Sequence, residues 1–374
     1  MEHNTTKSRR AFLYQLSMAG LSIPLAASSF TDEQTFRTMR QKKEGKLGIA
    51  LVGLGGYAGG QLAPALQQTE HCYLAGIVTG TPSKIPVWKE KYNIPDKNIY
   101  NYDNYDSIKD NPDIDIIYIV LPNSMHAEYT VRGFAAGKHV ICEKPMAITV
   151  ADCDRMIAAS KKAGKHLSIG YRLHFEPHNL EMMRLGTKKV YGDIKKMAAG
   201  FGFVIGDPTQ WRLKKDLAGG GPMQDLGIYC VQGLCYTTGM VPVSVTAQEG
   251  PKTIPDKFKE VEQSLKWQFE MPNGLMATGE ASYNDNMNFL RADAEKGSFE
   301  LSPAYNYGRL RGKTPEAPMT FDNINQQARQ MDGIALSMMK NQPSIVPGEM
   351  GRRDVKLITS VYEAMATGKK IKIS

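Results

Sequence analysis

The stretch "KLGIALVGLGGYAGGQLAPAL", residues 46–66, decides the fold. It opens with a short apolar run that predicts a buried strand, passes through a glycine-rich turn, and continues into Gln61–Leu66, which predicts a helix. Within the turn, Gly53, Gly55 and Ala58 match the spacing G-x-G-x-x-[GA]. A strand, this turn and a helix in direct succession predict one unit of a parallel, doubly wound sheet.

The glycine spacing has a physical reason that points to a dinucleotide. The first glycine makes the tight turn, the second lets a pyrophosphate approach the main chain, and the small third residue lets helix and strand pack closely. The free N–H groups at the start of the helix then face the phosphates. We expect a bound dinucleotide here, the alternative being a tight turn without a ligand. The residues expected to contact the cofactor are Gly53, Leu54, Gly55, Gly56, Tyr57 and Ala58.

The rest of the chain falls into two parts that differ in their pattern of predicted strands and helices. Up to residue 168, strand-like and helix-like runs alternate, which predicts a parallel sheet with helices on both faces. From residue 169 onward, strand-like runs are separated by turn signals, which predicts an α+β domain with a large, mostly antiparallel open sheet. The amphipathic run 349–368 predicts a helix that packs back on the first domain. We therefore predict a Rossmann domain at 46–168 and a second domain at 169–374.

The end of the second predicted strand favours one dinucleotide over the other. NAD sites usually place an acidic residue there to bind the ribose hydroxyls, whereas this chain has "VTGTPSK", residues 78–84. Thr79, Gly80 and Lys84 offer a hydroxyl, space and a cation to a 2′-phosphate. We predict NADP, with NAD the less favoured cofactor. The alternative for Lys84 is an ordinary solvated surface lysine.

Two further loops follow strand ends, where ligands bind in such sheets. The second of them, "CEKPM", places Glu143 and Lys144 beside the expected nicotinamide, where a lysine could hydrogen-bond a substrate hydroxyl and ease its deprotonation. In the first loop, "LPNSMHAEYT", His126 could line the cofactor or equally cap the next helix. The candidates from this first loop are Leu121, Pro122, Asn123 and His126.

The first thirty residues contain three segments in the order that is typical of an export signal. A basic front, a moderately apolar middle and a small-residue end predict a signal peptide over 1–30, the alternative being a disordered basic leader. The pair Arg9-Arg10 resembles a twin-arginine signal, which exports folded proteins. Residues 31–45 are polar and predict an arm or linker. We expect the protein in the periplasm, with the twin-arginine machinery as a partner and no membrane contact after export.

Composition narrows the possible partners. The chain of 374 residues is 42% hydrophobic with a net charge of +8, and its basic residues form no run interleaved with aromatics, so we expect a globular protein that does not bind nucleic acid. The five cysteines lack metal-ligand spacing, so we expect no metal. Cys72 and Cys142 lie in apolar runs and are expected to be buried thiols.

Three motifs together carry a family resemblance. The chain combines G-x-G-x-x-A, E-K-P at 143–145 and "GGGPMQDLGIY" at 219–229, a form of G-G-G-x-x-x-D-x-G-x-Y. It thereby resembles the glucose–fructose oxidoreductase and inositol dehydrogenase family, known as Gfo/Idh/MocA, from Lys46 to the end. Many members have histidine where this chain has Tyr229, and the tyrosine resembles the glucose–fructose oxidoreductase branch.

The resemblance implies roles for individual residues. Tyr229 would exchange the proton at the reacting sugar oxygen, Lys144 would stabilise its anion and orient the substrate, and Asp225 would hold a sugar hydroxyl. Family members place counterparts of Arg172, Trp211 and Arg212 near the nicotinamide, of Tyr102 near the adenosine, and of Tyr307 near the substrate. The alternatives are core aromatics for Trp211 and Tyr307 and a structural ion pair for Arg172. The implied substrate contacts are Lys144, Arg172, Asp225, Tyr229 and Tyr307.

The resemblance also implies a reaction. We predict an exported sugar oxidoreductase that moves hydride from an aldose C1 to bound NADP and on to a second sugar, working as a homodimer or homotetramer through the second domain's sheet. The arm between leader and first strand is short and lacks proline, unlike the long arm of the glucose–fructose oxidoreductase branch. The alternatives are therefore a sugar dehydrogenase with exchangeable NAD(P), a non-catalytic sugar-binding protein, and a glycosidase that uses nucleotide-assisted redox chemistry.

Overall fold

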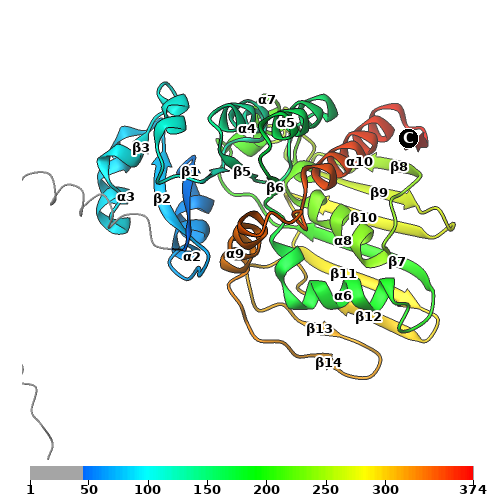
Figure 1. The fold of residues 1–374 in the computed structure, drawn as a ribbon. Coiled ribbons are helices and arrows are strands. Elements are labelled where there is room, and N and C mark those ends of the chain that lie inside the picture. Colours follow the sequence, from blue (N-terminus) through cyan, green and yellow to red (C-terminus); the bar gives the residue numbers. More distant parts are fainter. Residues whose placement is uncertain (1–44, 374) are drawn as a thin grey trace, which may run out of the picture. The chain divides into compact units, whose positions relative to one another are not determined.

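The structure is a computed structural model that describes residues 45–373 (Figure 1). The predicted signal peptide and all but the last residue of the predicted arm lie outside these residues. Two sheets organise the described chain, one of six strands and one of nine. The predicted fold class, a Rossmann domain followed by an α+β domain, is confirmed.

The first sheet is parallel throughout, with the strand order β3-β2-β1-β4-β5-β6. This order reverses direction between β1 and β4, and in open parallel sheets ligands bind at the carboxyl ends of the strands at such a point. The strands are β1 (Leu47–Val52), β2 (Cys72–Val78), β3 (Ile99–Tyr100), β4 (Ile116–Ile119), β5 (His139–Cys142) and β6 (Leu167–Ile169).

Residues close in sequence explain where helices of the first domain begin and end. The helix after the glycine-rich turn begins at Gly56 and includes a π-helical stretch at Ala58–Leu62, so the predicted start at Gln61 was late. The N-cap residue Thr149 accepts a hydrogen bond from the Asp152 N–H, and Gly164 ends that helix with φ +61°. The helices are α2 (Ala63–Ala65), α3 (Ile85–Tyr92), α4 (His126–Ala135) and α5 (Val150–Ala163).

The second sheet is antiparallel except for one pair, β7 with β10. Its order is β14-β13-β12-β11-β7-β10-β9-β8-β15. The strands are β7 (Ile194–Gly202), β8 (Ser244–Glu249), β9 (Ser264–Glu270), β10 (Met276–Ser282), β11 (Met287–Ala294), β12 (Gly297–Leu301), β13 (Gly312–Lys313), β14 (Pro318–Met319) and β15 (Ile371–Lys372).

Helices α6, α8 and α10 contact strands of the second sheet from one side (Figure 1). Helix α10 also contacts α5 and β6, so it touches elements of both domains. The sequence patterns did not predict α6 or α9, because neither has a clear apolar stripe bounded by strong stop signals. The helices are α6 (Pro177–Thr187), α7 (Lys215–Ala218), α8 (Ile228–Thr238), α9 (Gln326–Met339) and α10 (Gly348–Thr367).

Buried side chains from both sheets form one continuous apolar core. All five cysteines are buried free thiols, as predicted for Cys72 and Cys142. Within the part of the chain that the structure describes, none of the helices combines the length and apolar character of a membrane span.

Candidate active site

The glycine-rich turn lies at the carboxyl end of β1, where the first sheet reverses its order. Gly53 has φ +93°, and a Cβ there would lie 2.5 Å from the Val120 carbonyl oxygen, so only glycine fits. Gly55 and Gly56 are exposed and have open space where a side chain would stand. The turn thus presents bare main chain to the adjoining groove, as a bound pyrophosphate requires.

A groove of about 370 Å³ runs from this turn across the strand ends. Most residues predicted to bind the cofactor line it, and it also includes Thr81 and Val120, which lie next to predicted residues in sequence. The lining residues are Gly53, Leu54, Gly55, Gly56, Tyr57, Thr79, Thr81, Lys84, Tyr102, Val120, Leu121, Pro122, Asn123, Glu143, Lys144, Trp211, Arg212, Asp225, Tyr229 and Tyr307.

Three residues predicted to contact the cofactor, Ala58, Gly80 and His126, do not line the groove. Ala58 is fully buried, which suits the close packing expected of the third motif position. A Cβ on Gly80 would lie 2.7 Å from the ring of Tyr102, so Tyr102 covers this glycine from the groove. His126 is 1% exposed and does not line the groove either.

The imidazole of His126 connects two loops that border the groove. Its Nδ1 lies 2.8 Å from the Pro145 carbonyl oxygen and its Nε2 lies 2.9 Å from that of Leu121. Burial lowers the pKa of His126, and a neutral ring donates to one of these two carbonyls. His126 therefore positions the loops after β4 and β5 and opens α4, which is nearer to its predicted alternative role at the helix start.

The end of the groove expected to hold the adenosine has a hydroxyl and a cation and lacks an acidic residue in the described part of the chain, as predicted. Thr79 and Lys84 line it, and no carboxylate of the described residues lines this end. The Lys84 ammonium donates to the Leu54 carbonyl oxygen at 2.8 Å, which places the cation beside the glycine-rich turn. An ammonium has three donors, so two remain for a ligand.

A second cavity of about 630 Å³, which we call the substrate cavity, adjoins the nucleotide groove. The two spaces share five residues: Lys144, Arg212, Asp225, Tyr229 and Tyr307. The substrate cavity is lined by Lys144, Arg172, Phe201, Phe203, Gln210, Arg212, Asp225, Leu226, Tyr229, Tyr305, Asn306, Tyr307, Gly308, Arg309 and Asn323.

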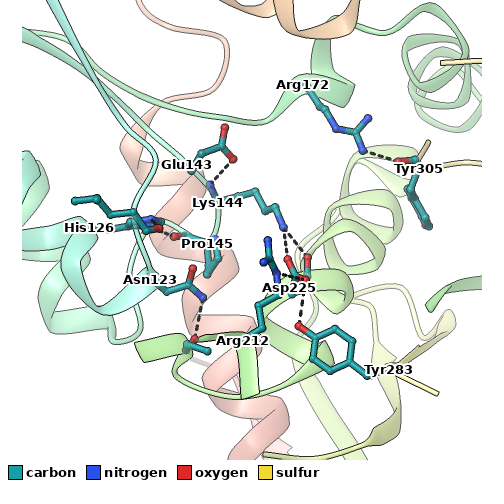
Figure 2. A network of polar contacts seen from close by, with 12 residues as sticks. Asn123, His126, Glu143, Lys144, Pro145, Arg172, Arg212, Asp225, Tyr283 and Tyr305 are labelled. Atoms are coloured by element: carbon teal, nitrogen blue, oxygen red, sulfur yellow. Dashed lines mark hydrogen bonds and ion pairs between the residues drawn. The ribbon is translucent and has the colours of Figure 1, made fainter. Parts of the chain in front are cut away.

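Asp225 is the centre of a polar cluster at this junction (Figure 2). Its Oδ1 accepts from the Lys144 ammonium at 3.0 Å, and its Oδ2 accepts from Arg212 Nε at 3.0 Å and from the Tyr283 hydroxyl at 3.1 Å. Lys144 also donates to the Asp225 main-chain oxygen at 2.7 Å. Tyr283 was not predicted, because it lies at the end of β10 outside the family motifs.

The cluster fixes the charge of its members. Burial disfavours the Asp225 carboxylate, but Lys144 and Arg212 hold the pKa of that carboxyl well below its usual range. Burial also lowers the pKa of Lys144, yet Tyr229 and Asp225 beside it outweigh this, so that pKa lies above the ordinary lysine value. Asp225 is therefore a fixed anion that holds Lys144 in place, with a lone pair on Oδ1 still able to accept a sugar hydroxyl.

The ring of Tyr229 lies between two cations. The Lys144 Nζ is 4.6 Å and the Arg172 guanidinium carbon 5.0 Å from its centroid, and Phe201 meets it edge-on at 5.6 Å. Positive charge at this distance stabilises an anion on the phenol oxygen. The predicted supporting cation, Lys144, is thus joined by a second one.

Arg172 lines the substrate cavity and not the nucleotide groove, which differs from its predicted place beside the nicotinamide. It is 2% exposed and donates to the carbonyl oxygens of Tyr305 and Asn306 and to the side chain of Gln326. These contacts hold the loop after β12, which carries Tyr307, and the guanidinium lies 4.5 Å from the Tyr307 ring. The ring of Tyr307 in turn faces that of Tyr57 across the groove, with centroids 5.8 Å apart.

Glu143 is held by a hydrogen-bond chain from the second domain. Its Oε1 accepts from the Tyr118 hydroxyl at 2.7 Å, and Gln330 on α9 donates to that hydroxyl at 2.8 Å. Burial raises the pKa of Glu143, against the opposing effects of Tyr118 and Lys144. Sequence reasoning missed Tyr118 and Gln330, because one lies mid-strand and the other in the unpredicted helix α9.

Comparisons with known proteins agree with this geometry. The model of an oxidoreductase family with an NAD-binding Rossmann fold matches residues 47–171, and the Gfo/Idh/MocA C-terminal domain matches residues 180–300. D-xylose 1-dehydrogenase [NADP(+)] of Haloarcula marismortui is 24% identical over 87% of this chain and 92% of its own. D-glucoside 3-dehydrogenase of Escherichia coli K12 is 25% identical over 87% of this chain and 97% of its own.

A solved structure is more similar. The aldose–aldose oxidoreductase of Caulobacter crescentus, crystallised with glycerol, is 41% identical and superimposes with a TM-score of 0.84 over 87% of this chain and 99% of its own. The two family models match segments in both domains of this chain. The chain belongs to the Gfo/Idh/MocA family of oxidoreductases.

Proposed function

We propose that the protein is an NADP-dependent sugar oxidoreductase that transfers hydride between a sugar carbon and the nicotinamide. The observation that carries this is the meeting of a dinucleotide groove and a polar, aromatic-lined cavity at Lys144, Asp225 and Tyr229. The named activities of the relatives support it, because xylose, glucoside and aldose oxidoreductases are among the proteins that this chain resembles.

The nicotinamide dinucleotide supplies the hydride acceptor, and the protein's own residues manage position and proton. Tyr229 takes the proton from the reacting sugar hydroxyl through its phenol oxygen. The form of Tyr229 that accepts this proton is its phenolate, which becomes a neutral phenol as the hydride leaves the sugar carbon. Lys144 and Arg172 stabilise the phenolate before the proton arrives, and Asp225 keeps the Lys144 ammonium in place at the junction. The residues that would hold the cofactor are those that line the groove.

The substrate cavity suits a sugar. Phe201 and Tyr305 offer ring faces to the apolar face of a pyranose, while Gln210, Asn306 and Asn323 offer amide donors and acceptors to its hydroxyls. The three amides and the fixed Asp225 carboxylate give the cavity both kinds of hydrogen-bonding group that a polyol requires.

We propose further that reduced nucleotide is reoxidised by a second sugar on the same protein. An aldose–aldose oxidoreductase among the relatives supports this cycle. The competing possibility is a dehydrogenase with freely exchanging cofactor, which the short arm favours. One experiment separates the two: the protein is purified without added nucleotide, and its absorbance at 340 nm and its fluorescence are recorded as sugars are added.

Bound nucleotide that becomes reduced with one aldose and is reoxidised by another supports the complete proposal. A protein that purifies empty but reduces added NADP with a sugar is the ordinary dehydrogenase. Absence of any reduction across a panel of aldoses and glycosides, with cofactor demonstrably bound, would overturn the proposed function and favour a sugar-binding protein.

The preference for NADP has its own test. We expect Lys84→Ala to weaken NADP binding with little change for NAD, because only NADP carries the 2′-phosphate that this ammonium would pair with. A partly exposed charge-assisted contact predicts a loss of roughly 1 kcal/mol. Fluorescence titration of both nucleotides measures it, with Lys89→Ala, an exposed lysine outside the groove, as the matched control. Equal affinity of the unaltered protein for NAD and NADP would contradict the assignment.

We also propose export by the twin-arginine route, which would deliver the protein folded around its cofactor. The support is the sequence of the first thirty residues alone. Replacing Arg9 and Arg10 with lysine is expected to leave active protein inside the cell, as measured by fractionation. Undiminished export of this variant would show that another route is used.

For assembly, we propose the face of the nine-stranded sheet opposite α6, α8 and α10. Along β9 the buried residues Leu265, Trp267 and Phe269 alternate with the more exposed Lys266 and Gln268, so a polar face is available to a second copy. Sedimentation of Gln268→Arg tests this, and an unchanged dimer or tetramer would place the interface elsewhere.

A further inference from the structure

The substrate cavity has an excess of positive charge. Four cationic side chains line it, namely Lys144, Arg172, Arg212 and Arg309, against the single carboxylate of Asp225. Lys144 and Arg212 both form ion pairs with that carboxylate. Asp225 cannot neutralise two cations, and the other two arginines have no share in it.

Arg172 is a buried cation that forms no ion pair with a carboxylate of the described residues, and only the Glu143 carboxylate acts on it from a greater distance. Its guanidinium is 2% exposed and makes its hydrogen bonds to two carbonyl oxygens and one amide, all of them uncharged. Its Nε is buried and has no hydrogen-bond partner among the described residues. A buried charge without an ion pair is costly, and a ligand anion in the cavity would reduce that cost.

Arg309 stands at the cavity wall in a conformation that few residues adopt. Its φ is +53°, and its main-chain N–H donates to the Asn323 side chain at 3.1 Å, which fixes the turn. The side chain is exposed, and no carboxylate of the described residues lies within ion-pair distance of it.

These two arginines are separate from the phosphate sites of the cofactor. Neither lines the nucleotide groove, whose own cations are Lys84, Lys144 and Arg212. The pyrophosphate of a dinucleotide lies against the glycine-rich turn in this fold, between the adenosine and the nicotinamide. The positive charge on Arg172 and Arg309 therefore faces the second ligand.

We propose that the preferred substrate is a sugar that carries an anionic group, a carboxylate or a phosphate, and that Arg309 is the residue that selects for it. This inference rests on the proposed function and names its substrate class. A guanidinium binds either group with two parallel hydrogen bonds. The reacting carbon lies at Tyr229 and Lys144, and the anion points toward Arg309 at the cavity wall, so the chemical step is unchanged.

The test compares sugars that differ in one group. Initial rates of nucleotide reduction by the cofactor-loaded protein are measured with D-glucose, D-glucuronate and D-glucose 6-phosphate, and with D-galactose against D-galacturonate. We expect kcat/KM for an anionic sugar to exceed that for its neutral partner by about tenfold, in line with one charge-assisted bidentate contact. The advantage should shrink as the ionic strength rises from about 0.02 to 0.5 M, because salt screens an exposed arginine. The rates with D-glucuronate and with D-glucose 6-phosphate show whether a carboxylate or a phosphate is preferred.

Arg309→Gln should lower kcat/KM for the anionic sugar about tenfold more than it lowers kcat/KM for D-glucose, so the advantage of the anionic sugar should disappear. Arg311→Gln is the matched control, because Arg311 is an exposed arginine two residues away that does not line the cavity. Equal rates for charged and neutral sugars, or the same loss in both variants, would overturn the inference.

Failure of the proposed function gives a different result, because then no sugar reduces the nucleotide. Calorimetric binding of D-glucuronate and D-glucose to the loaded protein still tests the charge preference in that case. Tighter binding of the uronate, abolished in Arg309→Gln, would support the anion site, and equal binding of the two sugars would reject it.

Discussion

Tyr229 is placed for proton exchange by its neighbours on both sides. Lys144 reaches it from the loop after β5, and Arg172 reaches it from the segment after β6, so two charges that follow strands of the parallel sheet flank a ring of the second domain. Neither cation is free to turn away, because Lys144 is held by Asp225 and Arg172 by three hydrogen-bond acceptors.

Tyr229→Phe should therefore separate binding from turnover. The phenylalanine keeps the ring between the two cations, so NADP affinity should stay nearly unchanged. Turnover should fall by ~10² or more, the usual scale for a lost general acid–base. Stopped-flow reduction of bound nucleotide and a fluorescence titration give the two quantities. Near-normal turnover would reassign the proton, and His126 is a poor substitute because both its ring nitrogens face main-chain carbonyls.

At the scale of elements, a buried carboxylate connects the motif loop to α10. Glu262 accepts from the N–H groups of Gly221 at 3.0 Å and Met223 at 3.1 Å, and from the Tyr362 hydroxyl at 2.8 Å. The loop leads directly into the helical segment that carries Asp225 and Tyr229. The G-G-G motif is thus explained by packing as well as by ligand access.

Gly220→Ala should lower stability through this contact. A Cβ on Gly220 would lie 2.0 Å from the Tyr362 hydroxyl oxygen, so the loop or α10 must shift, at a cost of roughly 1–3 kcal/mol. Thermal unfolding measures the loss, and Gly206→Ala, with nothing within 4 Å of the added carbon, is the control. Combining Gly220→Ala with Tyr362→Phe should cost less than the two changes added together, because the nearest clashing atom is gone, although the ring carbon Cζ at 2.6 Å remains. Strict additivity would show that the clash is relieved elsewhere.

At the scale of the whole molecule, the Asp225 cluster connects the two sheets. Lys144 follows β5 of the parallel sheet, whereas Asp225, Arg212 and Tyr283 belong to the second domain. The Asn123 side chain adds a neighbouring contact by donating to the Ala218 carbonyl oxygen at 2.8 Å. The hydrogen bonds and ion pairs of the site therefore also hold the two domains together.

Asp225→Asn should destabilise the protein in a pH-dependent way. At pH 7 it leaves two partly buried cations without a counter-ion, which costs roughly 3–5 kcal/mol. Because the folded-state pKa of Asp225 is depressed, its contribution is complete above the unfolded-state pKa of about 3.9 and is lost as the pH falls from there toward the folded value. The difference in unfolding free energy between the two proteins should therefore shrink below about pH 4.

Urea unfolding at pH 7, 5 and 3.5 provides the measurement. Asp154→Asn is the control, since Asp154 pairs with Arg352 on the exposed surface and its loss should change the midpoint little. A stability difference that widened on acidification would contradict the assignment of Asp225 as a fixed anion.

The sequence by itself determined the parallel sheet, the glycine-rich turn and the identity of the residues at the reacting centre. Each of these is a local property: apolar periodicity specifies a strand or helix, and the turn needs a glycine at Gly53 because its φ is positive. Lys144 was noted because it follows a predicted strand end, whereas Asp225 and Tyr229 were predicted from the family resemblance that their motif carries.

Only the tertiary structure decided which groups surround those residues. Arg172 lies beside Tyr229 although the two are 57 positions apart in the sequence. Tyr283 donates to Asp225 across a separation of 58 positions. Gln330 supports Glu143 through the Tyr118 hydroxyl, and the two are 187 positions apart. No local pattern encodes such pairs, because they arise where two separately formed sheets are packed together. The net charge of the substrate cavity is also a tertiary property. Arg309 adds to an excess of positive charge because Asp225 is the only carboxylate among the described lining residues.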